Sequence, residues 1–371
     1  MTVSETMPLL SPSARPAPLP PSALPSTSRG TAVRIPQAIA HRGYKALYPE
    51  NTMLAFRSAV AVGAHALETD LHLSADGQVV LSHDRTLKRC YGVDTPVGEC
   101  DWSYLQTLRT LKAPHEPMPR LVDLLTWLAE PGTGREKIWV LLDVKPDDAP
   151  EALLGAVARA FETVERDDGV PWEKRIVIGC WNSNFLNASL SLLPTFPLAH
   201  QSHSPSSSTR FLRSPSYPGL SFNMFQQTLV GPCGARFRKA LAAAPDAATR
   251  RLFVWTVNEP FWMRWAVKQG VDGVITDDPA KYLDVVGRYE EEVAAAARAS
   301  AQDEDAVGSA SDRQTSVFSA VPEPTSWTHR TKLYFQAAII QLLILLFTPL
   351  LLRSVRWQFK EPGYASRITK A

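Results

Sequence analysis

The sequence predicts an α/β protein whose main domain is a (β/α)8 barrel. Short apolar runs alternate with stretches of helical character from residue 37 onward, a pattern typical of βα units in a parallel sheet. Eight such runs fit within about 250 residues, the usual length of a barrel of this kind. Several runs end in charged or titratable side chains, and functional groups of such barrels lie at the carboxyl ends of the strands.

The barrel is expected over residues 35–288. Its strands are expected at the apolar runs 38–42, 66–73, 138–145, 175–181, 197–203, 219–225, 252–257 and 271–276. Asp76-Gly77 is a strong turn signal, so residues 79–83 should return as a hairpin partner of the second strand. Helices are expected at 52–62, 121–130, 150–163, 235–244, 260–269 and from 279 onward.

Two segments depart from a minimal barrel. Residues 85–120 are long and irregular, which indicates an insertion near the barrel mouth. Residues 204–218 are rich in Ser and Pro and are expected to form a mobile loop on the same face. Either segment could contact a large substrate or a membrane, but we favour ordinary surface loops for both.

The regions outside the barrel differ from it in composition. Residues 1–34 are rich in Pro and Ser and lack the apolar core of a signal peptide, so we expect disorder. Their prolines argue against the amphipathic helix of a mitochondrial presequence. Residues 289–332 are expected to extend the last helix and then form a disordered linker, and residues 353–371 are a basic tail.

Residues 333–352 are almost entirely apolar and long enough to cross about 30 Å of hydrocarbon as a helix. Trp327, Tyr334 and Trp357 flank or edge this stretch, as interfacial aromatic residues do. We therefore expect membrane attachment, with a buried core helix as the alternative. Spanning and monotopic insertion both remain open. The domain is expected to stay cytosolic, on the endoplasmic reticulum, a lipid droplet or the mitochondrial outer membrane.

Composition excludes some functions. A net charge of +2 and the lack of a long basic patch give no indication of nucleic-acid binding among 371 residues. The four cysteines are scattered without zinc-binding spacing, which favours free thiols in a reducing compartment. No protein partner is indicated.

Three acidic residues stand at strand ends. Glu68 and Asp70 are two positions apart on one strand and therefore point to the same face. With Asp143 they offer hard oxygen ligands suited to Mg²⁺ or Ca²⁺. The alternative is ion pairing, of Asp143 with Lys145 or of Asp70 with Arg42.

Two histidines accompany the acidic residues. His41 and His83 titrate near neutral pH, so one can accept a proton while the other donates one. Arg42 and Lys145 offer positive charge to phosphate oxygens. This combination indicates phosphodiester cleavage.

Other candidates are less specific. Trp255 could form the floor of the pocket or pack inside the barrel. The remaining barrel histidines have no comparable setting and stay unassigned: His65, His72, His115, His200 and His203.

The chain resembles the glycerophosphodiester phosphodiesterases. The motifs that carry the resemblance are 41–43 (HRG), 49–52 (PENT) with Phe56, 68–70 (ETD), 76–77 (DG), 83–84 (HD), 143–145 (DVK), 255–258 (WTVN) and 275–277 (ITD) with Pro279. The resemblance implies a TIM barrel with a divalent metal held by Glu68, Asp70 and Asp143. It also implies acid/base roles for His41 and His83, phosphate contacts for Arg42 and Lys145, and a supporting role for Glu50 near the His41 loop. Many members carry Glu where this chain has Asp143, which puts the metal preference in doubt, although the related sphingomyelinase D enzymes also use Asp-x-Lys.

Residues 41–46 (HRGYKA), the Asp143-Val144-Lys145 form and the apolar tail are most similar to the fungal phosphatidylglycerol-specific phospholipase C branch. That branch implies release of diacylglycerol and glycerol phosphate from phosphatidylglycerol. Hydrolysis of other glycerophosphodiesters, including lysophospholipase D activity, is the alternative. A catalytically dead, membrane-tethered binding protein is a third possibility, disfavoured by the intact acidic residues and histidines.

Overall fold

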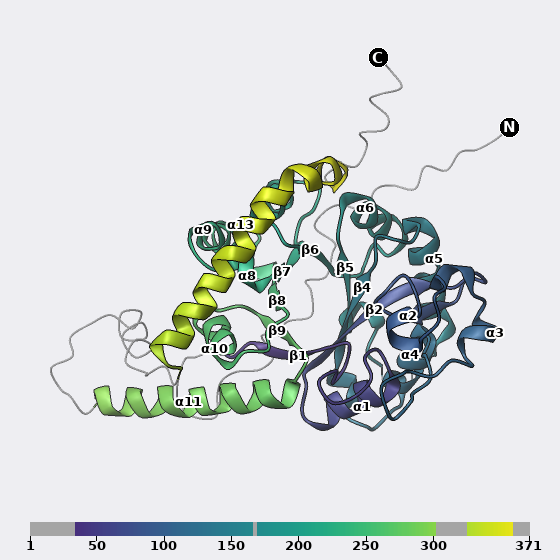
Figure 1. Cartoon of the computed structure of the whole chain (residues 1–371), viewed down its shortest axis with the longest axis horizontal. Coiled ribbons are helices and arrows are strands. Elements are labelled where there is room, and N and C mark those ends of the chain that lie inside the picture. The colour runs from purple at the N-terminus through teal and green to yellow at the C-terminus, as the bar shows by residue number, and fades with distance from the viewer. Residues whose placement is uncertain (1–33, 166–168, 302–324, 359–371) are drawn as a thin grey trace, which may run out of the picture.

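The computed structural model describes residues 34–165, 169–301 and 325–358. In these residues one sheet closes on itself, because its first strand pairs with both the second and the last (Figure 1). The parallel strands are β1 (Gln37–His41), β2 (Ala66–Leu73), β4 (Trp139–Val144), β5 (Ile176–Cys180), β6 (Leu198–Ser202), β7 (Ser221–Phe225), β8 (Leu252–Trp255) and β9 (Gly273–Thr276). The short β3 (Val79–Leu81) pairs antiparallel with β2. The predicted eight-stranded barrel and its hairpin are confirmed.

Helices follow the strands and cover the outside of the barrel (Figure 1). Their bounds are α1 (Met53–Ala61), α4 (Leu121–Ala129), α5 (Pro150–Thr163), α6 (Ser183–Leu192), α7 (Pro205–Arg213), α8 (Gln226–Leu229), α9 (Pro232–Ala242), α10 (Pro260–Lys268) and α11 (Pro279–Ala301). Five of them, α5, α7, α9, α10 and α11, begin with proline, whose missing N–H costs nothing in the first turn. Thr52 caps α1 by accepting from the Ala55 N–H at 3.2 Å.

The expectation of a mobile loop at 204–218 is wrong, because α7 occupies much of this segment. The Ser204 side chain caps the helix, and Pro205 occupies its first turn. Phe211 is fully buried, and its ring centre lies 4.1 Å from that of His200. Serine and proline therefore mark the start of a helix here. Helix α6 was not predicted at all, although Asn182 is a regular cap for it.

Buried side chains form two layers. Inside the barrel, a small cluster fills the space below the strand ends: Ile39, Ala66, Trp139, Leu141, Val177, Ala199, Phe253 and Ile275. A larger apolar layer lies between the strands and the helices. The barrel interior is thus packed, and a site at the strand ends rests on a rigid floor.

The insertion at 85–120 contains only short helices, among them α2 (Lys88–Tyr91) and α3 (Trp102–Leu105), around a small apolar cluster of its own. The Lys112 ammonium donates to the carbonyls of Lys45 and Tyr48 at 2.9 and 2.8 Å. The insertion therefore packs against the loop that follows β1, at the barrel mouth as predicted.

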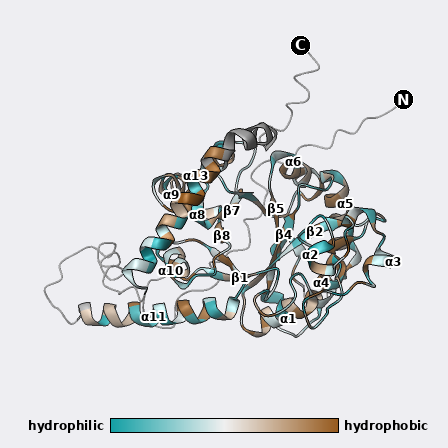
Figure 2. Ribbon diagram, in the orientation of Figure 1, coloured by the Kyte–Doolittle hydropathy of each residue, from teal (hydrophilic) through white to brown (hydrophobic). Residues whose placement is uncertain are grey.

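Helix α13 (Trp327–Gln358) lies diagonally along one side of the barrel (Figure 1). The Gln341 amide donates to the carbonyls of Gln227 and Val230 at 2.7 and 2.9 Å. The Tyr334 ring lies against Phe261, with centres 5.6 Å apart. Figure 2 shows hydrophilic residues near the N-terminal end of α13 and hydrophobic residues further along this helix.

Among the residues that the structure describes, no helix is both long and apolar enough to cross a membrane. The predicted membrane segment 333–352 is therefore not confirmed. The expected disordered N-terminus, the linker over 302–324 and most of the basic tail lie outside the described residues.

Candidate active site

A pocket of about 250 Å³ opens at the carboxyl ends of the barrel strands. Eight of the nine predicted site residues line it, and Glu50 lies behind them. The lining residues are His41, Arg42, Glu68, Asp70, His83, Asp143, Lys145, Trp181, Gln201, His203, Asn223, Trp255 and Ile275. Residues far apart in sequence meet here because parallel strands present their carboxyl ends on one face.

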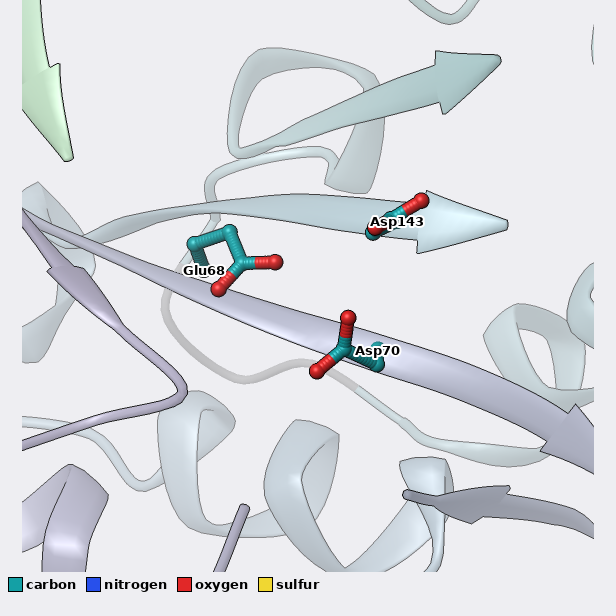
Figure 3. A group of neighbouring side chains, drawn as sticks. All are labelled: Glu68, Asp70 and Asp143. Carbon is teal, nitrogen blue, oxygen red and sulfur yellow. The ribbon is translucent and has the colours of Figure 1, made fainter. Parts of the chain in front are cut away.

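Three buried carboxylates form the centre of the site (Figure 3). Glu68 and Asp70 project from β2, and Asp143 lies beside Asp70 in the parallel register of β4. Burial, together with the negative charges of Asp70 and Asp143, raises the pKa of Glu68 well above its usual range. The ionised form of Glu68 is therefore unfavourable unless a further cation approaches.

The carboxylates fit a divalent cation. Each offers an oxygen, and the three oxygens lie within 4.8 Å of one another. Two ligands on one ion, each bonded at roughly 2.0–2.6 Å, are separated by no more than about 4–5 Å. An all-oxygen donor set suits Mg²⁺ or Ca²⁺ rather than a soft metal. Glu68, Asp70 and Asp143 could thus hold one such ion.

Two cations are already bound to these carboxylates. The Lys145 ammonium lies 2.7 Å from Asp70 and 2.5 Å from Asp143. Arg42 Nε lies 3.1 Å from Asp70. Burial favours the neutral form of Asp70, but the charges of Lys145 and Arg42 outweigh it and hold the pKa of Asp70 well below its usual range. The ion pairs considered as an alternative to metal binding are present, and Glu68 is the carboxylate that they leave uncompensated.

His41, the last residue of β1, is held by a carboxylate from the other end of the barrel sequence. Its Nδ1 lies 2.6 Å from Asp277, which also accepts from the Asn258 amide at 2.9 Å. This contact directs the Nδ1 proton to Asp277 and leaves Nε2 available for proton transfer. Burial lowers the pKa of His41 and so favours the neutral imidazole. Asp277 is the last residue of the 275–277 motif, but the sequence alone did not indicate its role.

His83 follows β3 and lines the same pocket as His41. Its Nδ1 lies 2.7 Å from Asp84, and Asp84 accepts from Arg89 at 2.6 Å. Arg89 in turn forms two bonds of 2.8 Å with Glu50, which also accepts from Arg42 at 2.8 Å. Glu50 thus links Arg89, which holds the partner of His83, to Arg42, which follows His41, without lining the pocket.

The turn after His41 depends on glycine. Gly43 has a φ of +79°, and a Cβ on it would lie 2.7 Å from the Ala55 backbone. Arg42 also adopts a left-handed φ of 55°, and its backbone N–H donates to Glu68 at 2.9 Å. The His-Arg-Gly sequence therefore folds the backbone into the site, because no larger residue fits at its third position.

Sequence reasoning missed one side of the pocket. The Trp181 indole and the Gln201 amide both donate to Asp143, at 2.8 and 2.5 Å. Asn223 donates to Gln201 at 2.9 Å, and these two residues are paired in register on β6 and β7. In the sequence, Trp181, Gln201 and Asn223 are marked only by their positions near strand ends. Together they fix the Asp143 carboxylate.

Aromatic rings complete this side. His203, left unassigned from sequence, stacks on Trp181 with ring centres 5.4 Å apart. Trp255 lies 4.9 Å from His203, so it forms part of the pocket wall. By contrast, His200 is buried in the core and bonded to Ser208.

A closed barrel with clustered carboxylates, cations and two supported histidines defines a hydrolase of phosphoric diesters. The family model described as glycerophosphoryl diester phosphodiesterase matches residues 41–281, and the chain belongs to this family. This membership establishes the enzyme class, a phosphoric diester hydrolase.

Curated relatives and solved structures agree with this assignment. A lysophospholipase D of Mus musculus is 29% identical over 283 residues, covering 68% of this chain and 86% of the relative. A probable glycerophosphodiester phosphodiesterase of Mycobacterium tuberculosis is 26% identical, covering 67% and 90%. The crystal structure of a putative glycerophosphoryl diester phosphodiesterase from Silicibacter pomeroyi has a TM-score of 0.58 at 23% identity. The match covers 70% of this chain and 96% of the solved chain. An Oleispira antarctica phosphodiesterase, solved with the product sn-glycerol-3-phosphate, has a TM-score of 0.57 at 21% identity, covering 68% and 97%. The two structures support the fold.

Proposed function

We propose that this protein is a membrane-attached, metal-dependent phospholipase C that hydrolyses phosphatidylglycerol to diacylglycerol and glycerol phosphate. The observation that carries the proposal is the pairing of His41 and His83 around one carboxylate cluster in a single pocket. Two titratable groups on opposite sides of a phosphate suit the two proton transfers of diester hydrolysis.

The residues then take distinct roles. Glu68, Asp70 and Asp143 would hold a divalent ion, which would supply positive charge to the phosphoryl oxygens. Lys145 and Arg42 add positive charge beside the same oxygens. One histidine removes a proton from the attacking oxygen, and the other protonates the oxygen of the departing alcohol. Because Asp277 and Asp84 hold the Nδ1 atoms, Nε2 is the proton-transferring atom of each ring.

Pocket size supports a lipid substrate held at a surface. A volume of about 250 Å³ accommodates a phosphate and a small alcohol but not two acyl chains. The acyl chains of a phospholipid would therefore remain outside the barrel. The motifs shared with the phosphatidylglycerol-specific branch then favour glycerol as the head group.

Membrane attachment is supported by the outward face of α13. Phe335, Leu342 and Leu346 on this helix are 66%, 55% and 63% exposed. Such large apolar side chains rarely gather on a soluble surface without a partner. Their helix contacts α8, which directly follows the carboxyl end of β7, so the part of α13 around Gln341 lies near the mouth of the barrel.

The opposite rim of the mouth has similar features. Leu47 and Leu111 are each 59% exposed, and Lys112 stands next to Leu111. Apolar side chains with neighbouring cations suit an anionic lipid surface. We propose that both rims contact the bilayer, on an intracellular membrane with the catalytic domain in the cytosol.

Replacing Leu342 and Leu346 with glutamine should weaken binding to phosphatidylglycerol-containing vesicles at least tenfold, because each buried leucine contributes about 1.5–3 kcal/mol. Vesicle sedimentation measures the bound fraction of each variant. The matched control replaces Val62 and Leu192, which are exposed at the C-terminal ends of α1 and α6, where the chain turns toward the amino ends of β2 and β6. This control should sediment like the unmodified protein. Equal sedimentation of both double variants contradicts attachment through α13.

A second candidate is lysophospholipase D or glycerophosphodiesterase activity, which the Mus musculus relative favours. The two reactions break different P–O bonds. Phospholipase C chemistry adds water and breaks the bond between phosphorus and diacylglycerol oxygen, whereas lysophospholipase D chemistry releases the head-group alcohol.

Product analysis separates these candidates. The full-length protein is incubated with phosphatidylglycerol, lysophosphatidylcholine and glycerophosphocholine, with Mg²⁺ or Ca²⁺ and with chelator. We expect diacylglycerol from phosphatidylglycerol only. Choline or lysophosphatidic acid as the main product would support the second candidate, and no turnover with any ion would support a binding protein without activity.

A further inference from the structure

An arginine-lined cavity lies at the opposite end of the barrel from the active site. Its volume is about 370 Å³, and it lies where the chain enters β8 and β9. Its charged lining residues are Arg34, Arg238, Arg250, Arg251 and Asp272. Catalytic groups of this fold lie at the carboxyl ends of the strands, so the reaction does not account for this cluster.

Two of the four guanidinium groups have carboxylate partners. Arg34 pairs with Asp272, and Arg250 forms bonds of 2.6 and 2.7 Å with Asp246. Arg250 is also fixed by the carbonyl of Leu220 at 2.9 Å. The positive charges of Arg34 and Arg250 are therefore offset by carboxylates, and the bonds of Arg250 hold the local backbone in place.

In the described residues, the hydrogen-bond partners of Arg238 and Arg251 are neutral groups. Arg238 donates to the Leu229 carbonyl at 2.5 Å and to the Gln269 side chain at 2.7 Å. Arg251 donates through one terminal nitrogen to the carbonyls of Ala248 and Arg250, and its buried Nε has no hydrogen-bond partner within the described part of the chain.

Carbonyl oxygens hold these guanidinium groups in place but do not neutralise them. Burial lowers the pKa of Arg238 and Arg251, and the positive charge of Arg34 lowers that of Arg251 further. A partly buried cation without a counter-charge costs free energy, and an anion entering the cavity would offset this cost.

From this geometry we infer that the cavity binds a phosphate monoester dianion. Pre-positioned guanidinium groups offer several N–H donors in the planar arrangement that matches phosphate oxygens. The two unmatched charges equal those of a monoester, which carries about −1.5 to −2 near pH 7. The volume leaves room for a small organic group on the phosphate.

The phosphate could be free in solution or carried by a lipid head group. Because the cavity opens on the side away from the barrel mouth, a free phosphate monoester is the expected ligand. The chemistry of recognition is the same for both sources, so the experiment includes an arm for each.

Calorimetry measures how many phosphate groups bind to each chain, with inorganic phosphate or glycerol 3-phosphate as the ligand. A chelator is present, so that the active site holds no divalent ion. Replacing both Arg238 and Arg251 with glutamine should remove one binding site per chain, or weaken it at least about tenfold. The matched control is Arg236→Gln with Arg288→Gln, which removes two exposed charges, one of them on the same helix as Arg238. This control should bind like the unmodified protein, and hydrolysis of phosphatidylglycerol in detergent micelles should be unchanged in both variants.

An equal number of sites in the unmodified protein and the Arg238/Arg251 variant overturns the inference, as does an equal loss in the control. If the double variant fails to fold, Arg251→Gln alone serves, because this side chain donates only to nearby backbone carbonyls. In the lipid arm, vesicles containing phosphatidic acid are sedimented with each variant. Loss of sedimentation only in the Arg238/Arg251 variant would identify a lipid-borne phosphate, and unchanged sedimentation with loss of the soluble site identifies a free one.

Discussion

Replacing His41 with alanine is expected to lower kcat for diester hydrolysis by about 10²–10⁴, the usual contribution of a general acid or base. His83→Ala should have an effect of similar size, because the two histidines serve different proton transfers. Both variants should stay folded. The free energy of unfolding should change little in His83→Ala, whose ring is 34% exposed, and more in His41→Ala, whose buried ring is bonded to Asp277.

The control for this prediction is His115→Ala. His115 is exposed and bonded only to the carbonyl of Thr110, so its loss should leave turnover unchanged within about twofold. Steady-state kinetics and urea unfolding of all three variants provide the measurement. Near-normal turnover in His41→Ala or His83→Ala would remove that histidine from the mechanism.

Glu68→Gln and Asp70→Asn should both nearly abolish hydrolysis but have opposite effects on stability. Glu68 is repelled by Asp70 and Asp143, so neutralising it should leave the metal-free protein as stable as before, or more so. Asp70 is paired with Lys145 and Arg42, so its loss leaves buried cations uncompensated and should cost about 3–5 kcal/mol.

Urea unfolding in chelator compares the two variants, and each serves as the matched control for the other. With a divalent ion present, only the unmodified protein should gain stability, because ligand binding to the folded state adds to its free energy of unfolding. A Glu68→Gln variant that is strongly destabilised in chelator would show that Glu68 is held by partners other than a metal ion.

Much of the fold could be predicted because its signals are local. Apolar runs bounded by turn residues identify strands, and the two-residue spacing of Glu68 and Asp70 puts both carboxylates on one face. The histidines and cations were found because each stands at the end of such a run.

The rest of the site depends on register between strands that are distant in sequence. Asp277 reaches His41 across 236 positions because β9 pairs with β1. Gln201 reaches Asp143, and Asn223 reaches Gln201, because β4 to β7 are aligned side by side. A single sequence does not contain this alignment, so ordinary polar residues at these positions attract no notice.

Helical segments show a similar limit. The Ser- and Pro-rich stretch that begins α7 has the composition of a loop, but the Ser204 cap and the burial of Phe211 stabilise it as a helix. The apolar run in α13 was predicted to attach to a membrane, with a buried core helix as the alternative. Gln341, a polar residue in this run, donates to backbone carbonyls at the end of α8.

Diester hydrolysis is expected to depend on one divalent ion shared by Glu68, Asp70 and Asp143. To test this dependence, the protein is stripped of metal, and hydrolysis of phosphatidylglycerol is measured while Mg²⁺ or Ca²⁺ is titrated back. We expect negligible turnover without metal and recovery that saturates at one bound ion per chain. Undiminished turnover in the metal-free protein, or binding of no ion by the unmodified chain, would show that the carboxylates do not act through a metal.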